Sequence, residues 1–174
     1  MALAYTRIKV EIREIFLRNR PDELYSISPK ATVPVLYLMN DTVIDESIDI
    51  MIWTLRQFDP DSWLNEKRED QLQIVYENDG DFKYWLDRYK YFDRYPKNSR
   101  EVYRSKCDEF LDKLDIMVSH SLNLFGDKIS IVDIAIFPFI RQMANVDQVW
   151  FEDVHYNLFK WLNRIIESSL FMCV

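Results

Sequence analysis

Residues 30–50 combine the side chains that are best suited to hold a small ligand. Val33 and Pro34 open the strand-like run TVPVLYLM, and Glu46 and Ser47 stand where an amphipathic helix is predicted to begin. A helix start carries free N–H groups and the positive end of the helix dipole, which both favour a ligand carboxylate. The Ser47 hydroxyl would add a donor and the Glu46 carboxylate an acceptor, so this pair matches the two charges of an amino-acid zwitterion.

Each of these four residues also has an ordinary structural interpretation. A trans proline is tolerated at the first position of a strand, and only about 5–6% of X–Pro bonds in folded proteins are cis. A serine just before a helix ordinarily caps it through its side-chain oxygen. Taken together, however, an exposed strand edge at Val33 could pair with a peptide backbone while Glu46 and Ser47 hold its charged end. The combination predicts a receptor for a small acidic peptide.

The segment SPKATVPVLYL, followed by DTVIDESIDIMIWTL, closely resembles the amino-terminal, thioredoxin-like domain of cytosolic, bacterial-type glutathione transferases. The resemblance implies that the Val33–Pro34 bond is cis and that the Val33 backbone pairs with the cysteinyl backbone of glutathione. It also implies that Glu46 and Ser47 hold the γ-glutamyl end. Ala31 stands where the family commonly has glycine, a departure that we expect to affect local backbone freedom only.

A second motif, Ser130-x-x-Asp133 in SIVDIAIFPFIRQMANVD, reads as a capping box. Ser130 is predicted to cap the third amide of a helix, while the Asp133 carboxylate reaches back to the Ser130 amide. A carboxylate near the core is costly unless these bonds form, so we interpret Asp133 as a folding signal and not as a catalytic acid. This stretch resembles the sixth helix of the same family.

The stretch DFKYWLDRYKYF mixes aromatic residues with lysine and arginine. Stacking on nucleic-acid bases would use such a mixture, but the chain carries a net charge of −7 and offers phosphate groups no global attraction. We expect instead an ordinary helix, whose inward face consists of Phe82, Trp85, Tyr89 and Phe92. In the resembling family this region borders the pocket for the electrophilic co-substrate. The resemblance therefore makes Tyr84, Arg88 and Tyr91 candidate pocket residues.

The sequence around these motifs predicts a small α/β unit followed by helices. Residues 1–5 read as the end of a helix, and IKVEIREI, residues 8–15, alternates apolar and polar residues as a half-buried strand does. Another helix is expected to open after Pro21. Two short strands separated by an Asn-Asp turn, and the helix from Ser47, complete this unit.

We place the thioredoxin-like domain at residues 1–58, a linker at 59–65 and an all-helical carboxy-terminal domain at 66–174. The fold class is thus an α/β thioredoxin-like domain that lacks its first strand, followed by the helical domain of glutathione transferases. Within the helix predicted after Ser99, the apolar face consists of Val102, Cys107, Phe110, Leu111, Leu114 and Met117.

The beginning of the chain departs from the family pattern. Family members start with a strand and a loop that carries the catalytic serine, cysteine or tyrosine. The first residues, Met1 to Tyr5, instead resemble the end of the first helix, and no serine or cysteine precedes Pro21. We therefore assign no catalytic residue, and we expect residues 8–15, without a neighbouring strand, to pair irregularly or to stay loose.

Three hypotheses about function are open at this point. The first is a glutathione transferase that conjugates glutathione to electrophiles or reduces disulfides, with a chain that begins too late because an internal methionine was taken as the start. Such a chain would have little activity. The second is a non-catalytic binding or scaffolding protein of the same fold, and the third is a decayed fragment that never folds stably. The resemblance implies glutathione as co-substrate with no cofactor, a small electrophile or disulfide as its reaction partner, and a homodimer.

Composition excludes several other classes of protein. Gly80 and Gly126 are the only glycines, which rules out glycine-rich phosphate loops. The two cysteines, Cys107 and Cys173, and the two histidines are far apart, so neither a metal site nor a disulfide framework is predicted. No apolar run approaches the roughly 20 residues of a membrane span, and the first residues do not read as a signal peptide. We expect a cytoplasmic protein with no membrane or nucleic-acid partner.

Overall fold

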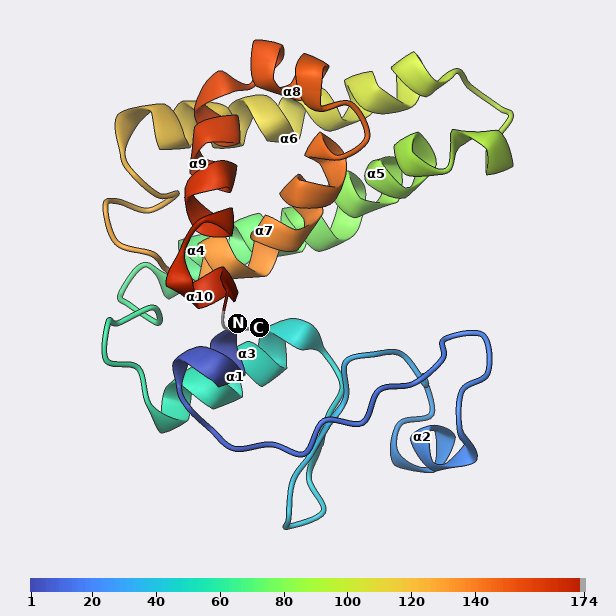
Figure 1. Ribbon diagram of the computed structural model, residues 1–174, viewed down its shortest axis with the longest axis vertical. Coiled ribbons are helices and arrows are strands. Elements are labelled where there is room, and N and C mark those ends of the chain that lie inside the picture. Colours follow the sequence, from blue (N-terminus) through green and yellow to red (C-terminus); the bar gives the residue numbers. More distant parts are fainter. Residues whose placement is uncertain (173–174) are drawn as a thin grey trace. The chain divides into compact units, whose positions relative to one another are not determined.

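The computed structural model describes residues 1–172, which form two compact units, Ala2–Pro60 and residues 61–172 (Figure 1). The first unit is α/β and the second is all-helical, so the predicted fold class is confirmed. The elements of the first unit are α1 (Ala2–Tyr5), α2 (Asp22–Ile27), β1 (Leu36–Tyr37), β2 (Val43–Ile44) and α3 (Ser47–Gln57).

The strands β1 and β2 form an antiparallel hairpin. Leu36 pairs with Ile44 and Tyr37 pairs with Val43. The turn between them contains the predicted Asn-Asp pair, and Asp41 adopts a φ of 62° there, a conformation that Asp tolerates better than most residues. On the other side of the unit, α1 packs against α3, and Ile50 and Leu55 are buried. This hairpin and α3 position the predicted ligand-binding residues.

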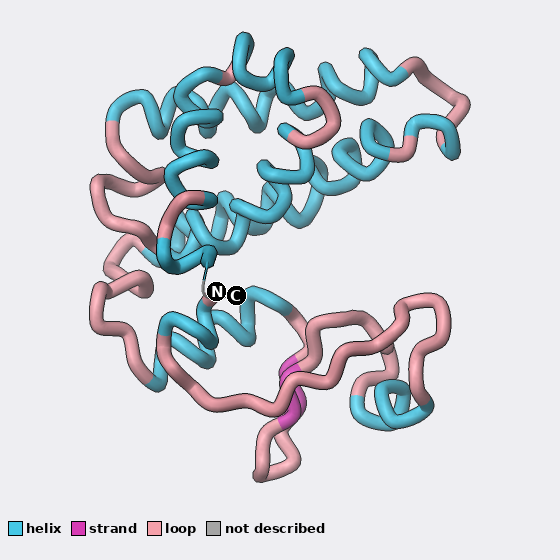
Figure 2. The backbone as a smooth tube through the Cα atoms, in the orientation of Figure 1, coloured by secondary structure: helices cyan, strands magenta, loops and turns pink. Residues whose placement is uncertain are grey.

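The strand predicted at residues 8–15 does not form. This stretch is an extended loop (Figure 2), and most of its side chains are exposed, with Ile12 at 75%. A strand is stable only where its N–H and carbonyl groups meet a neighbouring strand. Among the described residues, the only strands are β1 and β2, and they pair with each other. Residues 8–15 therefore have no neighbouring strand to pair with, and this segment is loose, as we expected for a chain that lacks that strand.

The second unit consists of helices joined by short loops. Its elements are α4 (Arg68–Glu77), the short π-helix η1 (Asn78–Phe82), α5 (Lys83–Lys90), the 3₁₀-helix η2 (Phe92–Arg94), α6 (Arg100–His120), α7 (Ile131–Ala144), α8 (Gln148–Val154), α9 (Tyr156–Ile166) and α10 (Ser169–Met172). The chain kinks at Gly80, whose ψ of −106° lies outside the helical range, so α4 and α5 do not form one straight helix. None of the helices in residues 1–172 has the length and apolar character needed to cross a membrane.

The buried face of α6 differs in part from the predicted one. Its fully buried residues recur at helical spacing and are Tyr103, Cys107, Leu111, Leu114 and Val118. Val102 was predicted to face inward, but it is exposed, because Tyr103 occupies the inward position one residue later. Phe92 was also predicted to be buried and is exposed, because α5 ends at Lys90, before it. Burial raises the pKa of the Cys107 thiol to about 12, which makes it an inert core residue; Cys173 lies outside the described residues.

The predicted capping box at the start of α7 is present and is fully buried. The Ser130 amide and hydroxyl donate to Asp133 Oδ2 at 2.9 and 2.7 Å. The Leu124 amide and the Trp161 indole donate to Oδ1 at 2.9 and 3.1 Å. Burial raises the pKa of Asp133, and these hydrogen bonds oppose that effect. The carboxylate thus joins the α7 start to a loop and to α9, which is the role of a folding signal.

Candidate functional site

Val33 and Pro34 lie in the exposed segment just before β1. The peptide bond between them is cis, as the resemblance implied. The Val33 side chain is 47% exposed, and its backbone forms no hydrogen bond with any residue that the structure describes. A backbone N–H and carbonyl left free in this way can pair with an extended peptide ligand.

Glu46 and Ser47 lie at the amino-terminal end of α3. Glu46 occupies the cap position with extended backbone angles, and Ser47 is the first helical residue. Neither side chain caps the helix, and the Ser47 hydroxyl has no hydrogen-bond partner within residues 1–172. The ordinary interpretation of Ser47 as a helix cap is therefore wrong. The amides of the first turn and the Ser47 hydroxyl are all left available to a ligand.

The register of the hairpin brings these two pairs of residues toward the same end of the sheet. Leu36 lies opposite Ile44, so the same antiparallel register places Pro34, two residues before Leu36, toward Glu46, two residues after Ile44. Two side-chain contacts hold the segments together there. Ser28 Oγ donates to Asp45 Oδ2 at 2.8 Å, and Lys30 Nζ donates to Glu46 Oε1.

Lys30 is the main cation of this corner. Its Nζ donates to Glu46 Oε1 at 2.6 Å and lies 3.4 Å from Asp45 Oδ1. The hydrogen bond to Glu46 raises the pKa of Lys30, and the charge of Asp45 adds to that effect. The hydrogen bond from Ser28 lowers the pKa of Asp45, and the charge of Lys30 contributes to the lowering. The corner therefore presents one cation and two carboxylates, of which Glu46 is exposed and Asp45 is half-buried.

Sequence reasoning missed the parts played by Ser28 and Lys30. Their contacts join residues that are 15 to 17 positions apart, across the hairpin. No local spacing rule predicts such pairs. A lysine two residues before the strand-like run, with a pair of acidic residues directly after the next strand, was the one signal that could have indicated them.

Ala31 adopts the left-handed conformation, with a φ of 49°, and is fully buried. A residue with a Cβ is disfavoured there relative to glycine. The left-handed conformation explains why glycine is the residue that the resemblance leads one to expect at this position. Ala31 lies two residues before Val33, and the Ala31 N–H donates to the Ser28 carbonyl at 2.8 Å. This hydrogen bond helps to fix the segment that carries Val33.

The three aromatic and basic residues proposed for the co-substrate divide into two groups on the helical unit. The Arg88 guanidinium lies over the Tyr84 ring at 3.3 Å, and it also lies 4.6 Å from the centre of the Tyr95 ring. Tyr91 follows α5 and instead contacts Lys90 and Arg94. The structure thus places Tyr84 and Arg88 together and Tyr91 in a neighbouring cluster.

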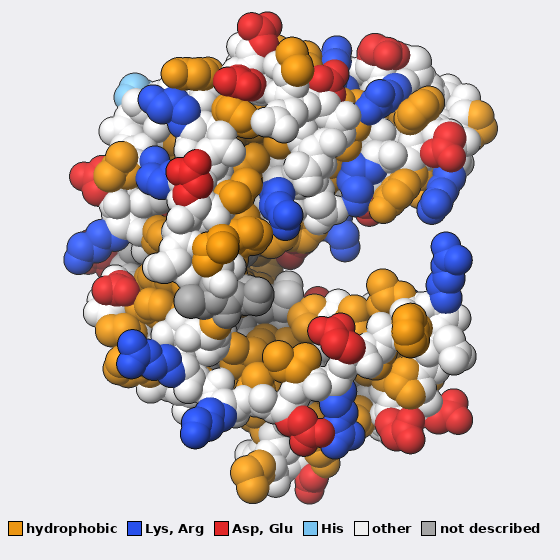
Figure 3. All heavy atoms as spheres, in the orientation of Figure 1, with side chains coloured by type: hydrophobic (Ala, Val, Ile, Leu, Met, Phe, Trp, Pro, Cys, Tyr) orange, Lys and Arg blue, Asp and Glu red, His pale blue; other side chains and the backbone are white. Residues whose placement is uncertain are grey.

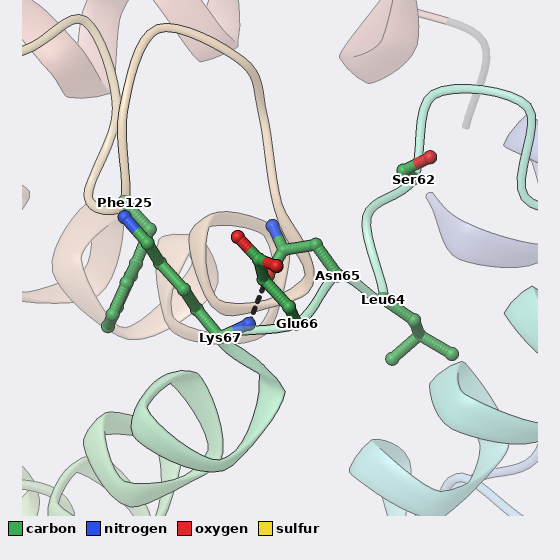
Figure 4. A pocket seen from close by; sticks show the side chains of 6 residues that line it. All are labelled: Ser62, Leu64, Asn65, Glu66, Lys67 and Phe125. Atoms are coloured by element: carbon green, nitrogen blue, oxygen red, sulfur yellow. Dashed lines mark hydrogen bonds between the residues drawn. The ribbon is translucent and has the colours of Figure 1, made fainter.

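A separate hollow of about 420 Å³ lies beside the loop that precedes α4 (Figure 4). The residues that line it are Ser62, Leu64, Asn65, Glu66, Lys67 and Phe125. Asn65 Oδ1 accepts hydrogen bonds from the Lys67 amide at 2.9 Å and from the Gln71 side chain at 2.8 Å, which shapes the turn into α4. None of the predicted site residues lines this hollow.

Two protein-family models match the chain. The model described as the N-terminal domain of glutathione S-transferase matches residues 1–57, and the model described as the C-terminal domain matches residues 83–164. The chain belongs to the glutathione S-transferase family. The two matches fall on the two units of the structure, so the family assignment covers both the α/β unit and the helices.

Solved structures of glutathione transferases share this fold. The transferase URE2P6 from Phanerochaete chrysosporium, in complex with oxidized glutathione, superposes with a TM-score of 0.82 at 20% identity, over 97% of this chain and 84% of that one. A glutathione S-transferase of class Gtt2 from Vibrio parahaemolyticus superposes with a TM-score of 0.79 at 22% identity, over 98% of this chain and 87% of that one. A glutathione S-transferase from Pseudomonas fluorescens superposes with a TM-score of 0.78 at 17% identity, over 97% of this chain and 87% of that one. None of the curated proteins matches this chain in sequence.

Proposed function

We propose that this chain binds glutathione at the exposed corner formed by Val33, Pro34, Glu46 and Ser47. The observation that carries the proposal is the set of unused hydrogen-bonding groups at that corner. The Val33 backbone and the Ser47 hydroxyl have no partner in residues 1–172, and the α3 amides are free. Oxidized glutathione is the ligand in the URE2P6 structure, which supports the choice of ligand.

Each part of glutathione has a matching group in this corner. The cysteinyl backbone pairs with the Val33 N–H and carbonyl, in the manner of an added strand. The γ-glutamyl carboxylate accepts from the Ser47 hydroxyl and the first-turn amides of α3, where the helix dipole favours negative charge. The γ-glutamyl ammonium binds the Glu46 carboxylate. Because Lys30 already contacts Glu46, the ligand ammonium shares that carboxylate with the lysine.

The reaction that follows from this binding is a nucleophilic attack by the glutathione sulfur. In conjugation, a carbon–sulfur bond forms, the leaving group departs with the bonding electrons, and the thiol proton passes to solvent. In disulfide reduction, the thiolate forms a new disulfide and the second sulfur leaves as a thiolate. An unassisted thiol with a pKa of about 8.5 is only a few per cent ionised at neutral pH. No catalytic residue is assigned in this chain, so we expect slow turnover.

Family membership further supports a homodimer that acts in the cytoplasm, with a small electrophile or a disulfide as the second substrate. Sedimentation equilibrium tests the homodimer. The proposal requires a particle of about twice the chain mass of 21.1 kDa. A mass of one chain at micromolar concentration would contradict it.

Isothermal titration with glutathione tests the site. Replacing Ser47 with alanine removes one donor, and we expect binding to weaken by about 0.5–2 kcal/mol. A matched control is Ser26→Ala, which removes an exposed serine hydroxyl from α2 and should leave affinity unchanged. Equal affinity for the wild type and Ser47→Ala would count against this corner.

A conjugation assay with a generic aryl halide then separates the catalytic and non-catalytic hypotheses. Turnover above the buffer rate, reduced together with glutathione affinity in Ser47→Ala, identifies a transferase. Glutathione binding with no rate above buffer identifies a binding protein of the same fold. No binding of glutathione at millimolar concentration would overturn the proposed function.

A further inference from the structure

The stretch that comprises α5, the connection after it and the start of α6 is strongly basic in an otherwise acidic chain. Residues 83–106 contain eight lysines and arginines against three acidic residues. Residues 61–82 contain two against seven, and residues 107–174 contain five against ten. Figure 3 shows lysine and arginine side chains over the region where α5 ends and α6 begins. Such a local excess attracts anions in spite of the net charge of −7.

Two arginines of this segment are held by aromatic rings and not by carboxylates. The Arg100 guanidinium lies 5.2 Å from the centre of the Tyr89 ring and 5.5 Å from that of Phe92. The Arg104 guanidinium lies 4.5 Å from the centre of the Trp150 ring. Neither arginine forms an ion pair with any residue in the described part of the chain. Stacking fixes the plane of a guanidinium and leaves its edge free to bind an oxyanion.

A small cavity of about 70 Å³ lies between these arginines. Its walls come from three helices: Tyr89 from α5, Arg100, Glu101 and Arg104 from α6, and Asp147 from the cap position of α8. Tyr89 is 2% exposed. Burial raises the pKa of the Tyr89 phenol, and the charges of Arg100 and Arg104 oppose this only in part. The phenol is therefore protonated at neutral pH. The cavity is therefore lined by two guanidinium groups, two carboxylates and one phenol, which hydrogen-bonds to Arg104.

One donor at this cavity has no partner. The Nε atom of Arg100 is buried and forms no hydrogen bond within residues 1–172. Another Arg100 nitrogen, Nη2, donates to the Val146 carbonyl at 3.2 Å, so the side chain is anchored and cannot simply turn toward solvent. A buried donor of a charged group without an acceptor costs more than the typical hydrogen bond contributes. The folded chain therefore favours an acceptor beside Arg100.

The carboxylates that line the cavity do not supply this acceptor. Asp147 Oδ1 accepts from the Trp150 amide at 3.1 Å, as a helix cap. Glu101 is exposed and forms no ion pair with either arginine. The volume exceeds the share of about 30 Å³ that one water molecule occupies in the liquid. A group of a few heavy atoms with several acceptor oxygens fits both the size and the donors.

We propose that this cavity binds a small oxyanion, namely a phosphate, sulfate or carboxylate group, between Arg100, Arg104 and Tyr89. The planar edges of the guanidinium groups donate to the anion oxygens, as in other arginine-oxyanion contacts. This site is made only of residues of the helical unit. It does not depend on glutathione binding, so the two proposals fail or succeed separately.

Thermal unfolding and titration calorimetry of the full chain test the site with phosphate, sulfate and acetate as probes, and with chloride at matched ionic strength as the reference. We expect a saturable rise in Tm with at least one oxyanion and a smaller rise with chloride. Arg100→Gln should weaken oxyanion binding about tenfold or more. The matched control is Arg94→Gln, which removes an arginine that lies over Tyr91, outside the cavity, and should bind as the wild type does.

A phosphate monoester distinguishes the two sources of the same group. Binding of glycerol phosphate at least as tight as that of inorganic phosphate means that the cavity takes the end of a larger molecule, whereas binding of the inorganic ion alone means a free anion. If Arg100→Gln does not fold, Arg104→Lys keeps the charge, loses the planar fork and should also weaken binding. An equal rise of Tm in all salts, or unchanged affinity in both cavity variants, would overturn the proposal and leave a cavity that holds water.

Discussion

The starts of α3 and α7 use the same two kinds of side chain in opposite ways. At α3 the acid directly precedes the serine, and both Glu46 and Ser47 are exposed. At α7 the serine precedes the acid by three residues, and both Ser130 and Asp133 are buried with their hydrogen bonds made inside the protein. The spacing explains the difference, because only the Ser-x-x-Asp order lets each side chain reach the other's amide.

The difference separates a structural helix start from one that can bind. Around Asp133, four donors from three parts of the chain are satisfied, and no capacity remains for a ligand. Around Ser47, the hydroxyl and the first-turn amides are left for an external partner. If this comparison is correct, changes at α7 reduce stability and changes at α3 reduce binding.

The largest effect is expected from Asp133→Ala. The substitution leaves the Leu124 amide, the Ser130 amide and the Trp161 indole buried without an acceptor, so we expect a loss of about 3–5 kcal/mol in the free energy of unfolding. Urea denaturation followed by circular dichroism measures the loss. Asp153→Ala is the matched control, since it removes an exposed acid that forms no ion pair with the described residues. Equal midpoints for the two variants would break the comparison.

An intermediate effect is expected when the two serines are exchanged for alanine. Ser130→Ala removes a buried cap and should cost about 1–2 kcal/mol of stability. Ser47→Ala removes an exposed hydroxyl without a partner and should change stability by less than about 0.5 kcal/mol. The same denaturation experiment compares them. A loss in Ser47→Ala as large as that in Ser130→Ala would show that Ser47 has a structural role.

The smallest effect concerns two carboxyl groups whose pKa values move in opposite directions. The hydrogen bond from Ser28 and the charge of Lys30 lower the pKa of Asp45. The stability that the ionised Asp45 contributes is therefore present above pH 3.8 and is lost as the pH falls through the lowered pKa. Burial raises the pKa of Asp133, so the folded chain takes up that proton before the unfolded chain does, and this protonation stabilises the fold as the pH falls toward 3.8.

Carboxyl carbon shifts in an NMR titration measure this difference directly. We expect Asp133 to titrate at a higher pH than Asp45, and Ser28→Ala to move the pKa of Asp45 back toward its ordinary value. Asp45 titrating above Asp133 would contradict both assignments.

Local sequence rules predicted the main helices and the capping box at the start of α7. The helical spacing after Ser47 and Ser130 gave the correct elements because those helices bury one face within their own unit. The Ser-x-x-Asp order was sufficient to predict the capping box. The cis bond at Val33–Pro34 was predicted only through the resemblance, since local sequence favours trans.

The predictions that failed have a common physical cause: the structure at those positions depends on residues that are distant in the sequence. The alternation in residues 8–15 predicts a strand, but strands need a partner that periodicity does not supply. The contacts of Lys30 with Glu46 and of Arg100 with the Tyr89 ring depend on how elements meet in space. At the start of α6, Tyr103 and not Val102 faces the core, because both are apolar enough to do so and the choice depends on the elements packed against them.

The central claim is that glutathione binds at the start of α3 beside the Val33–Pro34 segment. Amide chemical shifts of the ¹⁵N-labelled chain, followed during a titration with glutathione, test it most directly. The account predicts saturable shifts at Val33, Glu46 and Ser47, with the amides of Ser130 and Asp133 unchanged. Shifts confined to other residues, or none at saturating glutathione, would contradict it.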